Sequence, residues 1–129
     1  MSAFEGFKAF NFDEGTPYAS VTKNGLTFNK SVVKKLGCCE YVVLLINADE
    51  QKIALQKCSE KTQNGVQFCK NGENTKQIMP VRWNTKGLLS ELQSITGWDL
   101  SKDAYRIDGS VILEENAVLF DLSKARLIQ

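Results

Sequence analysis

The chain has 129 residues, 43% of them hydrophobic, which is enough for one domain with a core of its own. Because 16 Lys and Arg oppose 15 Asp and Glu, the net charge of +1 excludes a polycation, and nucleic-acid binding would need a local basic patch. The longest apolar run, residues 41–46, is far shorter than the ~20 residues of a membrane helix, and residues 1–13 lack the features of a secretory signal. The sequence therefore predicts a cytoplasmic protein with no membrane segment.

The chain contains no histidine. This excludes Ser-His-Asp and Cys-His nucleophiles and His-ligated metals, and no Gly-rich phosphate loop is present. We therefore predict a protein that is not an enzyme and that has no cofactor and no metal site. The four cysteines, Cys38, Cys39, Cys58 and Cys69, do not have zinc-site spacing. They are interpreted as small, half-buried thiols, with metal or redox chemistry as the alternative.

Residues 1–17 are interpreted as an N-terminal arm rich in phenylalanine. It carries four of the seven phenylalanines, Phe4, Phe7, Phe10 and Phe12. In one interpretation the arm packs these rings onto the main body, because aromatic side chains bury a large area. In the other, the arm is exposed and docks on a protein partner. The sequence leaves both possibilities open.

The first half, residues 18–58, opens with two short strands at 18–22 and 26–28. They flank Asn24-Gly25, a pair typical of tight hairpin turns. Asn29 is a suitable N-cap for a short helix that ends at Leu36-Gly37.

Two more strands are predicted after this helix. The continuous apolar run at 41–47 indicates a central strand covered on both faces, and 52–57 alternates between apolar and polar residues. Residues 59–77 are polar and are interpreted as a connector with a possible edge strand at 66–69.

The second half, residues 78–129, repeats this order. A strand at 79–83 precedes a helix that begins after Thr85 and ends at Gly97. Strands at 104–113 and 117–122 follow, with a bend at Asp108-Gly109. Residues 29–36 are echoed by 85–92, with an insertion around 96–102. The matched apolar pairs are Val32 with Leu88, Val33 with Leu89, Leu36 with Leu92, Tyr41 with Tyr105, Val43 with Ile107, Ile53 with Val118 and Leu55 with Phe120. We therefore expect residues 1–129 to form a single domain built from two similar halves.

Residues 22–57 carry a family resemblance. The features that carry it are Asn24-Gly25 followed by β-formers, Asn29-Lys30, the helix ending at Leu36-Gly37, Glu40-Tyr41-Val42, and Lys52-Ile53-Ala54-Leu55. This pattern resembles the swapped-hairpin DNA-binding domain of AbrB, SpoVT and MazE, with a degenerate second copy at about 79–122. The resemblance implies an α+β, β-rich, swapped-hairpin-like barrel of two tandem β-α-β-β halves, a pseudo-dimer in one chain.

The resemblance also implies a transcription-regulator-like or antitoxin-like protein that contacts the phosphates of duplex DNA. The candidate contact residues are Lys23, Asn24, Lys30, Lys34, Lys35, Arg82 and Lys86. A solvated lysine-rich helix face explains the lysines of the first half equally well. The alternative function is a non-enzymatic interaction or structural module that has lost DNA binding and docks on a protein partner through the arm. The sequence leaves open whether the chain is a monomer or a homodimer.

Overall fold

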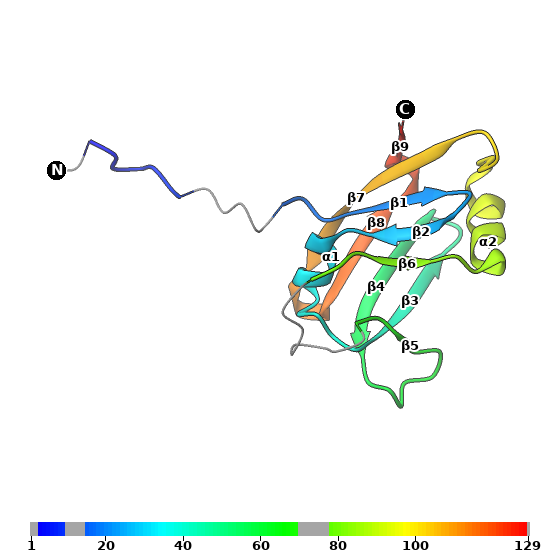
Figure 1. The fold of residues 1–129 in the computed structure, drawn as a ribbon, viewed down its shortest axis with the longest axis horizontal. Helices are drawn as coiled ribbons and strands as arrows, with labels where there is room; N and C mark the ends of the chain where they lie inside the picture. The colour runs from blue at the N-terminus through cyan, green and yellow to red at the C-terminus, as the bar shows by residue number, and fades with distance from the viewer. Residues whose placement is uncertain (1–2, 10–14, 70–77, 129) are drawn as a thin grey trace.

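A computed structural model describes residues 3–9, 15–69 and 78–128 of the chain (Figure 1). Within these residues, nine strands form one curled antiparallel sheet, a half-barrel accompanied by two α-helices. The strand order is β5-β3-β4-β8-β7-β1-β2-β6, and β9 pairs with β7 beside this path. The prediction of a β-rich α+β fold is confirmed.

The first half supplies β1 (Tyr18–Thr22), β2 (Gly25–Phe28), α1 (Lys30–Lys35), β3 (Tyr41–Asn47) and β4 (Lys52–Cys58), and β5 (Val66–Gln67) follows. The second half supplies β6 (Val81–Trp83), α2 (Lys86–Thr96), β7 (Ala104–Ile112), β8 (Ala117–Asp121) and β9 (Arg126–Ile128), with short 3-10 turns at Leu113–Glu115 and Leu122–Lys124. Every predicted strand and helix is present at nearly its predicted position. The strand β9 was not predicted.

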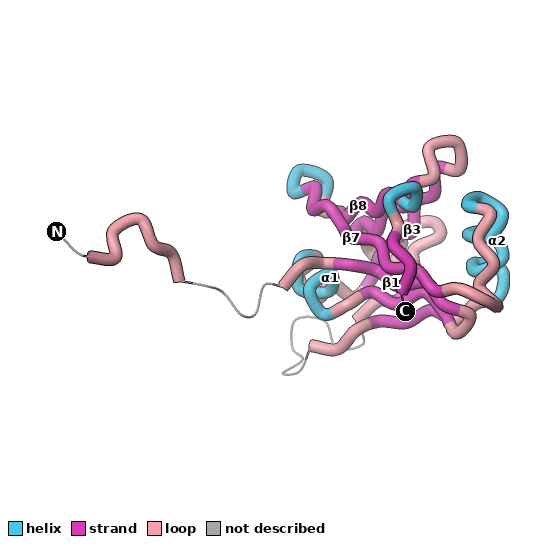
Figure 2. The backbone as a smooth tube through the Cα atoms, turned by 90° about the horizontal axis from the view of Figure 1, so that it is seen from above, coloured by secondary structure: helices cyan, strands magenta, loops and turns pink. Residues whose placement is uncertain are grey.

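Helix α1 begins at Asn29, as predicted, because the side chain of this residue satisfies several backbone groups. Its Oδ1 accepts from the N–H of Val32 at 3.1 Å and from the N–H of Tyr18 at 3.0 Å, and its Nδ2 donates to the Thr16 carbonyl at 2.9 Å. The cap therefore also fixes the entry of β1. Figures 1 and 2 show α1 and α2 at opposite ends of the strands β1, β2 and β6.

Strand β7 joins the two parts of the curled sheet, and the change takes place at Gly109. Up to Asp108 the strand pairs with β1, whereas from Gly109 onward it pairs with β8. A Cβ atom at Gly109 would lie 2.7 Å from Val118 Cγ1 and 2.9 Å from Phe120 Cε1. The bend predicted at this position therefore depends on the absence of a side chain.

One hydrophobic core lies inside the curl and takes residues from both halves. Its largest fully buried side chains include Phe28, Phe120, Leu26, Ile53, Leu55, Leu92 and Ile107. The rings of Phe28 and Phe120 lie 5.7 Å apart between centroids, and Trp83 meets Phe28 edge-on at 5.2 Å. Aromatic contacts thus join β2 and β6 to β8 across the interior.

The expectation that the strand at 41–47 is central and covered on both faces is wrong. Only Val42 of β3 is buried, and Leu45 and Ile46 are 46% and 40% exposed. The partner on one side, β5, pairs only with Tyr41 and Val42, so most of β3 is an edge. The strand that is central and adjoins the second half is β4, which pairs with both β3 and β8.

The predicted match between the halves is only partly reflected in burial. Val32 and Val33 are buried, but their counterparts Leu88 and Leu89 are half-buried, and only Leu92 is buried in α2. In β3 the buried residue is Val42, one position before the predicted Val43. In β7 the buried residue is Ile107, which the prediction matched with Val43. The predicted alignment of Tyr41 with Tyr105 is therefore shifted by one residue relative to the alignment of the buried positions, Val42 and Ile107.

The N-terminal arm does not pack its described rings onto the core. Phe4 and Phe7 are 71% and 74% exposed, and they contact each other edge-on with centroids 5.6 Å apart. Phe10 and Phe12 lie outside the described residues. No helix in residues 3–9, 15–69 and 78–128 is long and apolar enough to span a membrane.

Candidate nucleic-acid interface

A row of polar residues crosses five neighbouring strands on the outer face of the sheet. Strand pairing places Arg82 opposite Thr27, Thr27 opposite Ser20, Ser20 opposite Arg106, and Arg106 opposite Arg126. These five residues, which we call the arginine row, come from β6, β2, β1, β7 and β9 in that order. The three arginines of the whole chain all lie in this row.

Strand alternation explains why the row faces outward. In β1, β2 and β7 the flanking residues Ala19, Phe28 and Ile107 are buried in the core. Their neighbours in the row must therefore point to the opposite face, because successive side chains of a strand alternate. Arg82 and Arg126 are exposed.

Arg106 is held in place by groups on its own side of the sheet. Its guanidinium lies over the Tyr18 ring, 3.7 Å from the centroid, and its Nε is 3.4 Å from Asp108 Oδ1. That Nε is buried and has no hydrogen-bond partner in the described part of the chain, so its attraction to Asp108 is electrostatic. Arg126 Nη2 also donates to the Asp108 carboxylate, at 3.1 Å. One carboxylate is therefore shared by two arginines.

Shallow depressions border the arginine row on both sides. One has a volume of about 490 Å³ and is lined by Lys23, Asn24, Arg82 and Lys102 among others. The other, of about 400 Å³, is lined by Tyr18, Asn29, Lys30 and Pro80. Ser20 and Thr27 line both, so the row and the two depressions form one continuous surface.

This surface brings together four of the seven predicted contact residues. Lys23 and Asn24 form the turn between β1 and β2, Arg82 stands in the row with its Nε 3.3 Å from Thr27 Oγ1, and Lys30 follows β2. Lys34 and Lys35 lie in the last turn of α1.

Lys86 opens α2. Lys34, Lys35 and Lys86 belong neither to the arginine row nor to the lining of the two depressions.

The sequence prediction missed Tyr18, Lys102, Arg106 and Arg126. Arg106 stands between Tyr105 and Ile107 in a run whose alternation indicates an outward position, but nothing local shows that it faces β1. Arg126 was missed because β9 was not predicted. The rarity of arginine could have drawn attention to Arg106 and Arg126, because the chain has only three arginines.

None of the four cysteines lines either depression, and they form no disulfide. Cys39 is buried, and Cys38, Cys58 and Cys69 are half-buried, in agreement with the prediction of small semi-buried thiols. Burial, together with the nearby Cys69, raises the pKa of the Cys39 thiol to about 11. Within the described residues, no three Cys, Asp or Glu side chains come together as a metal site.

Comparisons of the chain with protein-family models, with curated proteins and with solved structures find no match.

Proposed function

We propose that the chain binds duplex DNA through the arginine row and the two depressions beside it, as a regulator-like or antitoxin-like protein. The observation that carries this proposal is the placement of all three arginines in one cross-strand row on the outer face of the sheet. Arginine is the side chain best suited to phosphate oxygens, because its planar fork of N–H donors matches their geometry.

The dimensions of the row suit a duplex. Neighbouring strands lie about 4.8 Å apart, so five strands carry the row over roughly 19 Å. A duplex presents a phosphate charge about every 1.7 Å of its axis, both strands counted, so several phosphates come within reach. Lys23, Lys30 and Lys102 extend the positive charge along the two depressions.

The surface also contains carboxylates. Asp108 neutralises part of the charge of Arg106 and Arg126, and Asp103 lines the depression that holds Lys102. We expect Asp108 to hold the two arginines in position in the free protein and to compete with phosphate for them. Affinity should therefore be moderate and strongly dependent on salt.

The direct test is fluorescence anisotropy with a labelled duplex of about 24 base pairs at 50 and 200 mM salt. With about four phosphates neutralised, we expect the affinity to fall roughly 100-fold between the two salt concentrations. Absence of binding at 50 mM salt, or binding that is insensitive to salt, would contradict the proposal.

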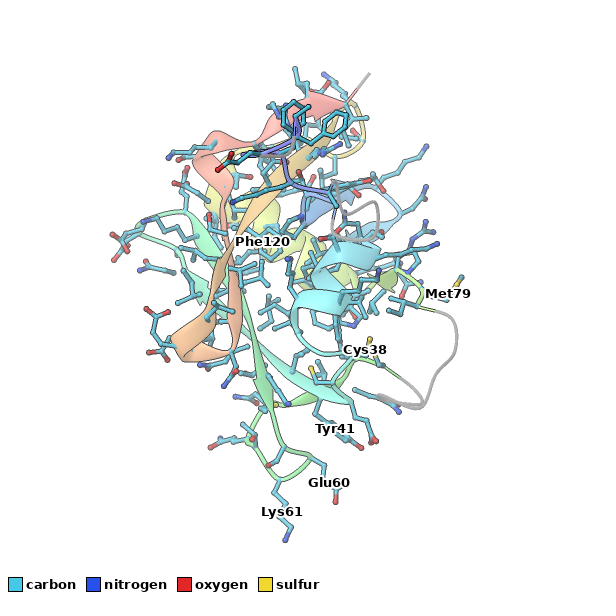
Figure 3. All side chains as sticks on the ribbon, turned by 90° about the vertical axis from the view of Figure 1, so that its left-hand side faces the viewer. Cys38, Tyr41, Glu60, Lys61, Met79 and Phe120 are labelled. Atoms are coloured by element: carbon cyan, nitrogen blue, oxygen red, sulfur yellow. The ribbon has the colours of Figure 1, made fainter. Side chains whose placement is uncertain are left out.

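Variants then locate the interface. Arg82→Ala and Arg106→Ala should each weaken binding several-fold and lower the salt slope by about one, whereas Asp108→Asn should strengthen binding. Lys61→Ala is the matched control, since Lys61 lies in the loop between β4 and β5, at the tip seen in Figure 3. An effect of Lys61→Ala as large as that of Arg82→Ala would show that DNA binding is not localised to this surface.

The fold proposal that accompanies this function is a fused swapped-hairpin barrel. When β5 of the connector is counted as the first strand of the second half, exchange of the halves replaces β1 by β5, β2 by β6, β3 by β7 and β4 by β8. Applied to the observed strand order read as a ring, this exchange returns the same order, with one neighbour pair, β5 with β6, not hydrogen-bonded. Equivalent strands meet in β2·β6 and β4·β8, which supports the proposal.

Separate expression tests the fused barrel. Because each half borrows strand partners from the other, residues 1–77 and 78–129 should each be unfolded alone and should fold when mixed. Circular dichroism and gel filtration measure both outcomes. A half that folds by itself would contradict the fused barrel.

A protein-interaction module is the second candidate, favoured by the exposed Phe4–Phe7 pair. Two aromatic rings that touch each other and remain more than two-thirds exposed are a typical docking element. Phe4→Ala with Phe7→Ala should leave the melting temperature unchanged and abolish binding to a protein partner. A loss of stability would show instead that the arm packs on the body.

A further inference from the structure

Two of the four cysteines, Cys39 and Cys69, are neighbours just beyond the end of the β3·β5 ladder. The ladder pairs Val42 with Val66 and Tyr41 with Gln67. Beyond the ladder the two segments stay hydrogen-bonded in a less regular way: the Phe68 N–H donates to the Glu40 carbonyl at 2.6 Å, and the Cys69 N–H donates to the Cys39 carbonyl at 3.2 Å. Both thiols pack at the edge of the core.

Residues joined by a backbone hydrogen bond between antiparallel segments have Cα atoms about 5.5 Å apart. This distance lies within the range of about 4.4–6.8 Å found in disulfides. Cys38 also lies near Cys69 and helps to raise the pKa of its thiol, but its backbone N–H donates to the Val33 carbonyl instead. Cys38 precedes Cys39 in a left-handed conformation with φ 52°, and Cys58 stands opposite Tyr41 on the far side of β3. Figure 3 labels Cys38 and Tyr41, which mark this corner of the molecule.

We propose that Cys39 and Cys69 form a reversible disulfide, a redox-responsive modification site that fastens β5 to the corner between α1 and β3. The proposal does not depend on nucleic-acid binding. The oxidant it requires is a small disulfide of the glutathione type.

The exchange proceeds in two balanced steps. The half-buried Cys69, as thiolate, attacks one sulfur of the small disulfide, forms a mixed disulfide and releases one small thiolate. Cys39 then loses its proton to solvent and attacks the Cys69 sulfur, which releases the second small thiolate. Two protein thiols are oxidised and one small disulfide is reduced to two thiols.

Burial makes this site slow rather than inert. Burial and the nearby Cys38 raise the pKa of the Cys69 thiol, and burial and the nearby Cys69 raise the pKa of the Cys39 thiol to about 11, so the thiolates are scarce near neutral pH. Closure of the bridge should therefore accelerate as the pH rises from 7 to 9. This slowness suits a site that responds to sustained oxidation.

The bridge would fasten a weakly held part of the sheet. Strand β5 has only two residues, both exposed, and is paired on one side only. A bridge that closes a loop of about 30 residues constrains the unfolded chain, so we expect the melting temperature to rise by roughly 10 °C on oxidation. A reducing agent should reverse the shift.

The test uses the full chain with oxidised glutathione at pH 8.5, followed by alkylation of free thiols and mass spectrometry. We expect a loss of two hydrogens, two alkylated cysteines instead of four, and fragment ions that link Cys39 to Cys69. A chain that carries only glutathione adducts or unmodified thiols, or a bridge that involves Cys38 or Cys58, overturns the proposal.

Variants provide a second arm. Cys69→Ser and Cys39→Ala should abolish both the bridge and the oxidation-dependent shift of the melting temperature, whereas Cys58→Ser is the matched control and should retain both. Because Cys39→Ala changes a buried position, the linkage in the unsubstituted chain decides the question if that variant fails to fold. Retention of the shift in Cys69→Ser overturns the proposal.

Discussion

The two halves of the chain share an order of elements but use their helices differently. Helix α1 has six residues, of which Ser31, Val32 and Val33 are buried, and Asn29 caps it through its side chain. Helix α2 has eleven residues, of which only Leu92 is buried, and its N-cap Thr85 makes no side-chain capping bond. The shorter helix is thus the more deeply embedded one.

This difference shows that a repeated apolar pattern does not guarantee repeated burial. The two helices stand at opposite ends of the strands, and the core takes in Val32 and Val33 of α1 but only Leu92 of α2 as fully buried residues. A short helix that cannot stand alone depends on tertiary contacts. Substitutions at equivalent positions should therefore have unequal effects, larger in the first half.

The largest contrast is expected between Val33→Asp and Leu89→Asp. Val33 is 1% exposed, so an aspartate there buries an unpaired charge and should cost more than about 4 kcal/mol, enough to unfold the chain. Leu89 is half-buried, and its aspartate can reach water at a cost of about 1–2 kcal/mol. Urea denaturation measures both, and equal losses would show that the halves are energetically alike.

Two glycines provide a second contrast: Gly109, where β7 changes its partner strand, and Gly87 in helix α2. Gly109→Ala would force a Cβ to within 3 Å of Val118 and Phe120 and should cost about 2–3 kcal/mol. Gly87→Ala is the matched control, since a Cβ there meets nothing within 4 Å in α2. It should stabilise the chain by up to about 1 kcal/mol. Thermal unfolding of both variants checks the prediction, and a neutral Gly109→Ala would contradict it.

The thiols distinguish the halves in their response to alkali, since the chain has no cysteine after Cys69. The pKa of Cys39 is raised from 9.0 to about 11. The folded state therefore keeps a proton that the unfolded state has lost, and stability should fall as the pH rises from about 9 to 11. The loss is on the order of 2 kcal/mol. Urea titrations at pH 8 and 11 measure this loss of unfolding free energy. The loss should be smaller in Cys39→Ala than in Cys58→Ser, because Cys58→Ser retains the Cys39 thiol.

The smallest effects concern the two helix caps. Asn29→Ala removes hydrogen bonds to Val32, Tyr18 and Thr16 and should cost about 1–2 kcal/mol. Thr85→Ala removes no capping bond and should change stability by less than about 0.5 kcal/mol. A comparable loss in both variants, measured by thermal unfolding, would remove this distinction between the halves.

Part of the candidate surface could be predicted from local sequence. Asn24-Gly25 fixes the turn that presents Lys23, and Lys30 follows a cap that is also a local signal. Arg106 and Arg126 could not be found in this way, because they join the surface only through the pairing of β7 with β1 and β9. Such pairings join segments far apart in the chain, and no local periodicity specifies the register between them.

The sequence by itself determined the helices and the strands β1 to β8, but not β9. Turn residues, an N-cap and alternating apolar positions specify strands and helices through contacts between near neighbours, and these were predicted nearly at their observed bounds. Only the tertiary structure decided which strand is central, which of two matched helices is embedded, and that three distant arginines share one row. These outcomes depend on long-range strand pairing and on the curl of the sheet, and both result from contacts between segments that are far apart in the chain.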